Sequence, residues 1–376
     1  MATAHYLHLN ARGAVAMRPS RRGLEITGRF GRSAEGGIAP DGAAELFRRW
    51  RGDRFTLLVD SVDEELHLDE IPKLRAGDRQ RMLGRRIAQR FRDRRLATAL
   101  LLDAGERRWG WRSLTGAGAG RTPILIAGIP IDADLQAWTA LARTERIRIG
   151  GVHSPALLSH ELAKRIGGAP SGLLLTVQPA GIRQTLLIDG QPRFTRLAVL
   201  PGAHIDAKAI CAEVARVVQY LLMSQLISRD LMREGRIGIW VVTDGIADAE
   251  ALPQELVVDN SSAIEVHSMS AARLGGPLLH DGSDDGLPAG DPVAGLSLWS
   301  QPLLAARTGA GYANREIREA DRDVALRRQA LGIGAGALVS SLCVYGAVAA
   351  IEQGARSSPA DPLTRAELSE RASLRE

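Results

Sequence analysis

The order of predicted elements repeats once along this chain. Over residues 5–60, three short runs of alternating apolar residues, separated by turn residues, predict an antiparallel meander, and a helix and a further strand follow it. Over residues 172–245 three such strands recur, followed by a long helix predicted from Asp206 to about Glu234 and by another strand. A repeated unit of this kind predicts an α/β chain made of two related halves.

A second constraint is the stretch from residue 330 to residue 351. It contains no charged side chain, although Asp, Glu, Lys and Arg make up 24% of the whole chain. A helix of this length, at about 1.5 Å per residue, crosses a hydrocarbon core of roughly 30 Å. The alternative is a buried helix of a soluble core, but the charged flanks on both sides favour a transmembrane helix over residues 330–351.

The flanks of this stretch predict its orientation. Positive charge is retained on the cytoplasmic side of a membrane, so the residues before the span are expected in the cytoplasm and residues 352–376 outside it. A juxtamembrane helix is predicted over residues 314–329. The arginines that carry the asymmetry are Arg315, Arg318, Arg322, Arg327 and Arg328.

Small residues recur every four positions within the predicted span, at Gly332, Gly336 and Ser340. Such a row lets two membrane helices approach closely, which predicts transmembrane self-association and a homodimer. A composition rich in Gly and Ala produces the same row by chance, and the sequence does not separate these two interpretations.

The most basic part of the chain is a helix predicted over residues 77–95. Its apolar residues recur at helical spacing, which leaves an arginine-rich outer face. One interpretation is a solvated face that is partly paired with neighbouring acids. The other is a docking face for an acidic partner or for anionic lipid. The candidate docking residues are Arg79, Arg85, Arg86 and Arg90.

Composition argues against several other functions. Aromatic residues make up only 4% of the chain and no DNA-binding motif accompanies the charge, so nucleic-acid binding is not expected. The two cysteines, Cys211 and Cys343, support neither a disulfide framework nor a structural zinc site. No metal site or catalytic residue is predicted: Asp60, Asp63 and Glu64 could form an acid–base set, but nothing in the sequence predicts a cleft around them.

Four segments resemble bacterial actin-like proteins. Residues 59–92 and 124–158 are similar to first-half segments of actin-like proteins that build pili, residues 172–202 to their second phosphate hairpin, and residues 312–328 to the sequence that leads out of the domain. Together they resemble the PilM-like proteins of type IV pilus assembly and the membrane-tethered GspL-like proteins of type II secretion. The resemblance implies an actin-like (RNase H-like) α/β fold, with two duplicated subdomains and mixed sheets.

This resemblance divides the chain into five parts. Membrane-tethered relatives usually carry a periplasmic ferredoxin-like domain, which the short segment after the predicted span cannot form. The parts are an actin-like subdomain I (1–170), an actin-like subdomain II (171–313), the juxtamembrane helix (314–329), the transmembrane helix (330–351) and a short extracytoplasmic tail (352–376).

Departures from the family at its nucleotide site predict weak or absent ATP binding. Gln178 stands where the family has the Asp of an Asp-x-Gly hairpin, and Pro179 lacks the N–H that a phosphate could use. The first-half hairpin, residues 8–13, also lacks the acid, and the adenosine-side Gly-Gly pair survives only as Thr243-Asp244-Gly245. No cofactor and no catalysis are therefore expected.

The first functional hypothesis is a non-catalytic scaffold in the bacterial inner membrane. It would span the membrane once, with its N-terminal domain in the cytoplasm, and couple cytoplasmic and membrane components of a type IV pilus or type II secretion-like assembly machine. The alternative is a membrane-anchored actin-like ATPase or nucleotide-dependent switch.

Overall fold

The computed structural model divides the chain into two compact units, residues 1–318 and residues 319–376. All labelled strands and helices belong to the first unit. The structure describes residues 4–21, 23–31, 41–51, 53–91, 95–102, 121–167, 171–178, 181–200, 205–234, 237–243, 252, 255–259, 262–271, 274, 278–279, 296–305, 311–312, 340–351 and 353.

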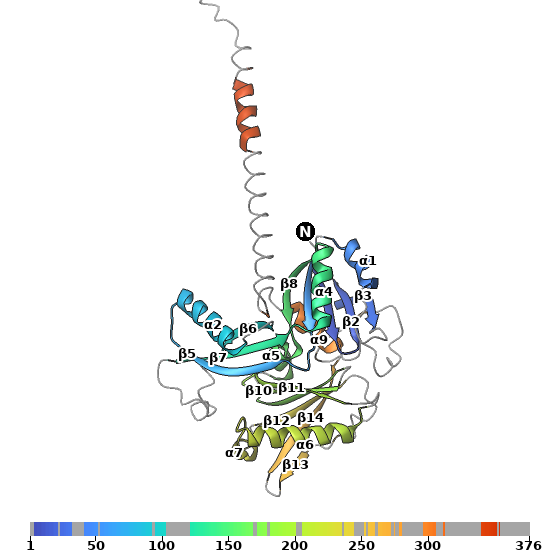
Figure 1. The fold of residues 1–376 in the computed structure, drawn as a ribbon, viewed down its shortest axis with the longest axis vertical. Coiled ribbons are helices and arrows are strands. Elements are labelled where there is room, and N and C mark those ends of the chain that lie inside the picture. Colours follow the sequence, from blue (N-terminus) through green and yellow to red (C-terminus); the bar gives the residue numbers. More distant parts are fainter. Residues whose placement is uncertain are drawn as a thin grey trace, which may run out of the picture. The chain divides into compact units, whose positions relative to one another are not determined.

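The first half of the chain folds around a mixed sheet (Figure 1). Its strands are β1 (Ala4–Asn10), β2 (Gly13–Ser20), β3 (Gly23–Gly31), β4 (Arg54–Val59), β8 (Arg148–His153) and the short β15 (Leu278–Leu279). The first three form the predicted antiparallel meander, and β4 and β8 add in parallel beside β1. The order is β15-β3-β2-β1-β4-β8, so a strand from late in the chain pairs with the first meander.

The second half builds a sheet whose first four strands are arranged in the same order. Its strands are β9 (Gly172–Gln178), β10 (Gly181–Ile188), β11 (Gln191–Val199), β12 (Gly238–Thr243), β13 (Glu255–Asp259) and β14 (Ser262–Ser270). They run in the order β11-β10-β9-β12-β14-β13, with β12 and β14 parallel to β9. Both sheets share the order third-second-first-fourth followed by one more parallel strand, which confirms the predicted duplication in an α/β fold with mixed sheets.

A glycine opens the second strand of each meander, for the same reason in both. Gly13 has a φ of +155° and Gly181 a φ of +150°, which L side chains rarely adopt. A Cβ atom on Gly13 would lie 2.1 Å from the backbone oxygen of Phe30, and one on Gly181 would lie 2.0 Å from that of Ala198. The duplication is therefore visible in the backbone of both hairpins.

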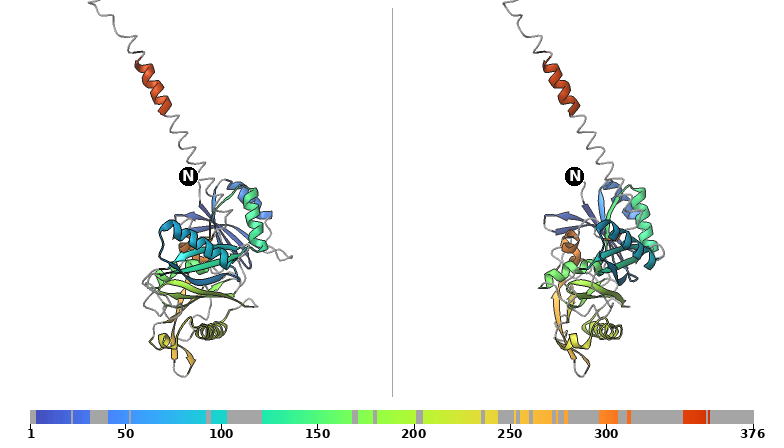
Figure 2. Two further views of the ribbon diagram at one scale, coloured as in Figure 1. Left: turned by 60° about the vertical axis from the view of Figure 1, so that its left-hand side comes forward. Right: turned by 90° about the vertical axis from the view of Figure 1, so that its left-hand side faces the viewer.

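Helices cover both faces of each sheet (Figures 1 and 2). The helices are α1 (Asp41–Arg49), α4 (Ala133–Thr144), α5 (Pro155–Gly167), α6 (Ala207–Met223), α7 (Arg229–Arg233) and α9 (Ser297–Ala305). Helices α1 and α4 share a core with the first sheet, and α6 and α7 share one with the second. Helices α5 and α9 pack with residues of both sheets in a third core. Strands with apolar rows on both faces are thereby buried on both sides.

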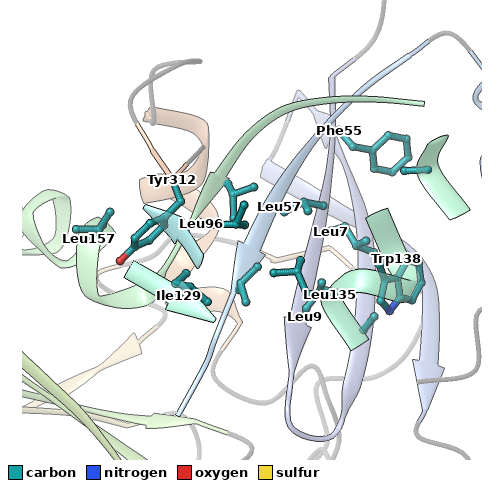
Figure 3. Close-up of a cluster of buried hydrophobic side chains, with 14 of the residues drawn as sticks. Leu7, Leu9, Phe55, Leu57, Leu96, Ile129, Leu135, Trp138, Leu157 and Tyr312 are labelled. Carbon is teal, nitrogen blue, oxygen red and sulfur yellow. The ribbon is translucent and has the colours of Figure 1, made fainter. Parts of the chain in front are cut away.

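The core beside the outer face of the first sheet is built around aromatic side chains (Figure 3). Trp138 of α4 is 1% exposed, and its ring meets those of Phe30 and Phe47 edge-on at centroid distances of 5.5 and 5.7 Å. At the other end of the same cluster, Tyr312 lies beside Leu157 (Figure 3). Tyr312, the last described residue of the first unit, is therefore built into the core of its first half.

A small antiparallel sheet is inserted between β4 and α4. It consists of β5 (Glu65–Pro72), β7 (Arg121–Pro130) and β6 (Arg95–Leu101), in the order β5-β7-β6, with helix α2 (Ala76–Arg90) packed on it. The sequence predicts α2, β6 and β7 but not β5, because acidic residues interrupt its apolar alternation.

The single helix predicted from Asp206 to about Glu234 is wrong. The Asp206 side chain caps α6, which starts where the predicted helix does, but α6 ends at Met223 and a second helix, α7, begins at Arg229. Between them Gln225 has a φ of +58°, which no α-helix interior accepts, and the Ser228 hydroxyl caps α7 by accepting from the Leu231 N–H. Apolar periodicity continues through the break, because Ile227 and Met232 both enter the same core.

In the second unit, residues 340–351 form a helix whose side chains are exposed. Its large apolar residues are Leu342, Val344, Tyr345, Val348 and Ile351. Within the described residues, no helix combines the length and the apolar character needed to cross a membrane. Residues 313–339, which hold the rest of the predicted span and the juxtamembrane helix, lie outside the described residues.

Candidate functional site

Polar side chains gather where the two halves of the first unit face each other. Every second residue of these strands faces inward, and along each inward-facing row the side chains change from apolar to buried polar ones. The rows are Tyr6-His8-Asn10 in β1, Leu58-Asp60 at the end of β4, Leu174-Thr176-Gln178 in β9 and Leu187-Thr185-Arg183 in β10.

Arg183 joins the two halves through an ion pair that is out of contact with water. Its Nε donates to Asp60 Oδ1 at 2.8 Å, and its Nη1 donates to Glu64 Oε2 at 3.1 Å and to Thr195 Oγ1 at 3.0 Å. Its Nη2 lies 2.6 Å from Asp60 Oδ1 and donates to the backbone oxygen of Ser61 at 2.5 Å. The side chain of Arg183 is 1% exposed and those of both acids are 0% exposed. All three guanidinium nitrogens therefore have acceptors, as burial of a cation requires.

Glu64 collects two further donors on its other oxygen. The hydroxyl of Tyr312 donates to Glu64 Oε1 at 2.6 Å, and the hydroxyl of Ser154 donates to the same atom. Ser154 also begins α5, because its Oγ accepts from the Leu157 N–H at 3.1 Å. We call Asp60, Glu64, Ser154, Arg183, Thr195 and Tyr312 the Arg183 network.

The electrostatics of the Arg183 network follow from its burial. Burial raises the pKa of the Glu64 carboxyl, and the Arg183 charge and the donors on Oε1 offset this only in part. Burial acts to lower the pKa of Arg183, but Asp60 and Glu64 outweigh it, and the pKa is raised. Burial and the neighbouring Glu64 raise the pKa of Tyr312 well above its ordinary value, so its phenol remains a donor. The network is thus a cation held between two carboxyl groups, with neutral donors completing its hydrogen bonds.

The first hairpin uses its own side chain where a phosphate-binding hairpin offers backbone N–H groups. Asn10 Oδ1 accepts from the N–H of Arg12 at 2.9 Å and from that of Gly13 at 3.2 Å. Backbone amides at such a turn are the groups that would cradle a phosphate. Here both already have an acceptor within the protein.

The second hairpin is turned inward in a similar way. Gln178 is 2% exposed, and its Nε2 donates to Thr176 Oγ1 at 3.1 Å. It therefore points into the space between the halves as an amide and brings no carboxylate for a metal ion or water. Pro179, Asp244 and Gly245, the other altered positions, lie outside the described residues.

The four arginines predicted to dock a partner do not form one free face. Arg86 Nε lies 3.4 Å from Asp69 Oδ2, and Arg90 Nη2 lies 2.9 Å from His67 Nδ1, so both contact β5. Arg85 is exposed and Arg79 is partly exposed, and neither makes an ion pair with another described residue. Their role in docking stays a prediction.

Most of the small residues predicted to pair membrane helices lie outside the described part of the chain. Gly332 and Gly336 lie outside the described residues, whereas Ser340 opens the exposed helical stretch of the second unit. Their role in self-association stays a prediction.

Sequence reasoning noticed Asp60 and Glu64 but missed the site that they form. Their partner is Arg183, which lies 123 and 119 residues away from them in the chain. A signal for it was present: a lone arginine at an inward position of the β10 alternation requires a buried acid. Tyr312 and Ser154 carry no comparable local signal.

Several distantly related solved structures are similar to this chain, among them the following three. The PilM-PilN type IV pilus biogenesis complex aligns with a TM-score of 0.46 and 13% identity, over 80% of this chain and 99% of that chain. The cytoplasmic domain of EpsL, an inner membrane component of the type II secretion system of Vibrio cholerae, aligns with a TM-score of 0.39 and 13% identity, over 81% and 96%. A Bacteroides thetaiotaomicron protein with an actin-like ATPase fold and unknown function aligns with a TM-score of 0.39 and 11% identity, over 81% and 96%.

No family model matches the chain, and no curated protein sequence does. The order of strands in the two sheets establishes a duplicated α/β fold with mixed sheets. The solved structures to which the chain is similar include the PilM-PilN complex, the EpsL cytoplasmic domain and a protein with an actin-like ATPase fold, in line with the resemblance that the sequence predicts.

Proposed function

We propose that this protein is a non-catalytic, membrane-anchored scaffold whose actin-like domain works through protein contacts. The observation that carries the proposal is the state of the space between the halves, where actin-like ATPases hold nucleotide. A buried ion pair joins the halves through Arg183, and Asn10 occupies the amides of the first hairpin. Among the described residues of the second hairpin, the inward position is held by the amide Gln178, which supplies no carboxylate for Mg²⁺.

A membrane anchor is supported by the sequence and by the described part of the second unit. Residues 330–351 carry no charge, and large apolar side chains stand exposed along the helical stretch 340–351. An exposed apolar surface of this kind requires lipid or a protein partner to cover it. The arginines before the stretch favour a cytoplasmic actin-like domain.

The machine that the scaffold serves is proposed to be a type IV pilus or a type II secretion-like system of the bacterial inner membrane. The resemblance of residues 59–92, 124–158, 172–202 and 312–328 supports this, and so does the presence of one actin-like domain beside one predicted span. Its partners would be cytoplasmic and membrane components of that machine.

Calorimetric titration of the full chain in detergent micelles with Mg-ATP tests the absence of a nucleotide site. We expect no heat of binding at millimolar ATP, because the phosphate-facing groups of both hairpins are altered or occupied. A known actin-like ATPase titrated under the same conditions is the positive control. Micromolar affinity would contradict the scaffold proposal and make the domain a nucleotide-dependent switch or an enzyme.

Self-association through the predicted span is tested by Gly332→Leu combined with Gly336→Leu. The added side chains block close approach of two helices, so a membrane two-hybrid signal should fall several-fold. Ala330→Leu with Gly334→Leu adds seven side-chain carbons against eight, also one turn apart, on the opposite side of the helix. Equal signals from the two double variants would remove the pairing hypothesis.

A further inference from the structure

Tyr312, near the end of the first unit, is fixed by a backbone hydrogen bond and by its buried side chain. Its N–H donates to the backbone oxygen of Val152 at 2.7 Å, forming an isolated antiparallel bridge to β8. Its ring is 1% exposed and packs beside Leu157 in the first core (Figure 3). The preceding Gly311 runs so close to β8 that a Cβ atom there would lie 2.3 Å from the Val152 oxygen. The chain is thus pinned at Tyr312, directly before residues 314–351, which carry the predicted link to the membrane.

The phenol of Tyr312 ends on the same carboxylate that Arg183 holds. Glu64 accepts from Tyr312 and Ser154 on Oε1 and from Arg183 on Oε2. These three donors come from separate parts of the fold: the end of the unit, the start of α5 and the second sheet. One buried carboxylate therefore accepts hydrogen bonds from all three parts.

We propose that the Arg183 network couples the contact between the two halves to the position of Tyr312, the last described residue of the first unit, with Glu64 as the shared acceptor. A partner that separates the halves would loosen Tyr312, and a pull on the chain after Tyr312 would loosen the halves. The coupling adds a conformational output to the proposed scaffold, and it stands on contacts that do not depend on the identity of the machine.

The physical reason is that the contact between the halves and the Tyr312 contact share Glu64, so the loss of either one weakens the other. When the halves separate, Arg183 leaves Glu64, and the carboxylate must find water or a proton, which weakens its fixed geometry toward Tyr312. When Tyr312 withdraws, Glu64 Oε1 loses a donor and water gains access to the ion pair, whose strength depends on exclusion from water. A coupling free energy between two sites acts equally in both directions.

Hydrogen exchange of the full chain in detergent micelles, resolved to single amides, tests the coupling. Arg183→Lys keeps the charge but loses the fork that reaches Glu64 and Thr195 together. We expect it to raise exchange at the Tyr312 amide about tenfold relative to the amides of α6. In return, Tyr312→Phe, which removes only the hydroxyl, should raise exchange at the Asp60 amide, which donates to Leu9 in the first sheet.

Three comparisons decide the outcome. Tyr6→Phe makes the same change in a buried tyrosine outside the network and should leave the Asp60 amide unchanged. Thr195→Val removes one partner of Arg183 and provides a milder variant if Arg183→Lys does not fold. The proposal is overturned if the exchange rate of the Tyr312 amide changes no more than those of the α6 amides in both Arg183→Lys and Thr195→Val. It is also overturned if the fold-changes in exchange rate caused by Tyr312→Phe and Arg183→Lys multiply in the double variant.

Discussion

Replacing Arg183 with methionine should lower the free energy of unfolding by about 3–5 kcal/mol, because it leaves two buried carboxyl groups without their cation. Asp60 and Glu64 are 0% exposed at their side chains, so water cannot replace the guanidinium. Denaturant unfolding followed by tryptophan fluorescence reports the loss, since Trp138 and Trp299 are buried in two different cores of the first unit.

The ion pair between Arg18 and Glu25 provides the matched control. Its two nitrogen–oxygen contacts are both 3.0 Å, but its side chains are 50% and 37% exposed. Arg18→Met should therefore cost much less than Arg183→Met, because water replaces an exposed partner. If Arg183→Met costs no more than Arg18→Met, the ion pair between the halves does not stabilise the fold.

A third variant separates loss of the cation from loss of the pair. Combining Arg183→Met with Asp60→Asn and Glu64→Gln removes all three charges together. Because the burial cost of unpaired carboxylates then disappears, the triple variant should recover part of the stability that the single variant loses. If the triple variant is less stable than Arg183→Met, loss of the hydrogen bonds outweighs relief of the unpaired charges, and hydrogen-bond geometry dominates the network.

Stability should also fall as the pH is lowered from about 6.5 to about 4, and buried histidines are the reason. Burial lowers the pKa of His8 to about 4, although Asp60 acts in the opposite direction. Burial and the nearby His160 lower the pKa of His153 to about 4 as well. The unfolded chain protonates these histidines near pH 6.5 and the folded chain does not, so each contributes stability that is present above pH 6.5 and lost progressively below it.

The expected slope is about 1.4 kcal/mol per pH unit for each histidine, or roughly 3 kcal/mol each over the whole interval. Glu64 acts with the opposite sign: its pKa is raised in the folded state, so its contribution is present below its unfolded value of 4.5 and is lost as the pH rises through the folded value. It offsets part of the fall.

Denaturant unfolding at several pH values between 7.5 and 4.5 measures this slope. His8→Gln and His153→Gln should each reduce it, whatever their effect on stability at pH 7.5, because glutamine binds no proton. The comparison of slopes removes any packing cost of the substitution. An unchanged slope in both variants would show that protonation of these two histidines does not limit acid stability.

The meanders, the helices that follow them and the apolar faces of α2 and α4 could be predicted from the sequence because each is a local pattern. Alternation over a few residues, turn residues such as Asp189-Gly190, and caps such as Asp132 and Asp206 need no distant partner to be recognised. Repetition of the pattern predicted an α/β chain of two related halves.

The site was decided by tertiary contacts alone. Arg183 finds its acids more than a hundred residues away, β15 pairs with a strand near the N-terminus, and Tyr312 closes on Glu64 across 248 positions. The break at Gln225 also escaped the pattern, because Ile227 and Met232 continue the apolar face across it. Local periodicity reports which face of an element is buried. Which buried polar groups meet depends on how the two halves dock, and only the folded chain contains that information.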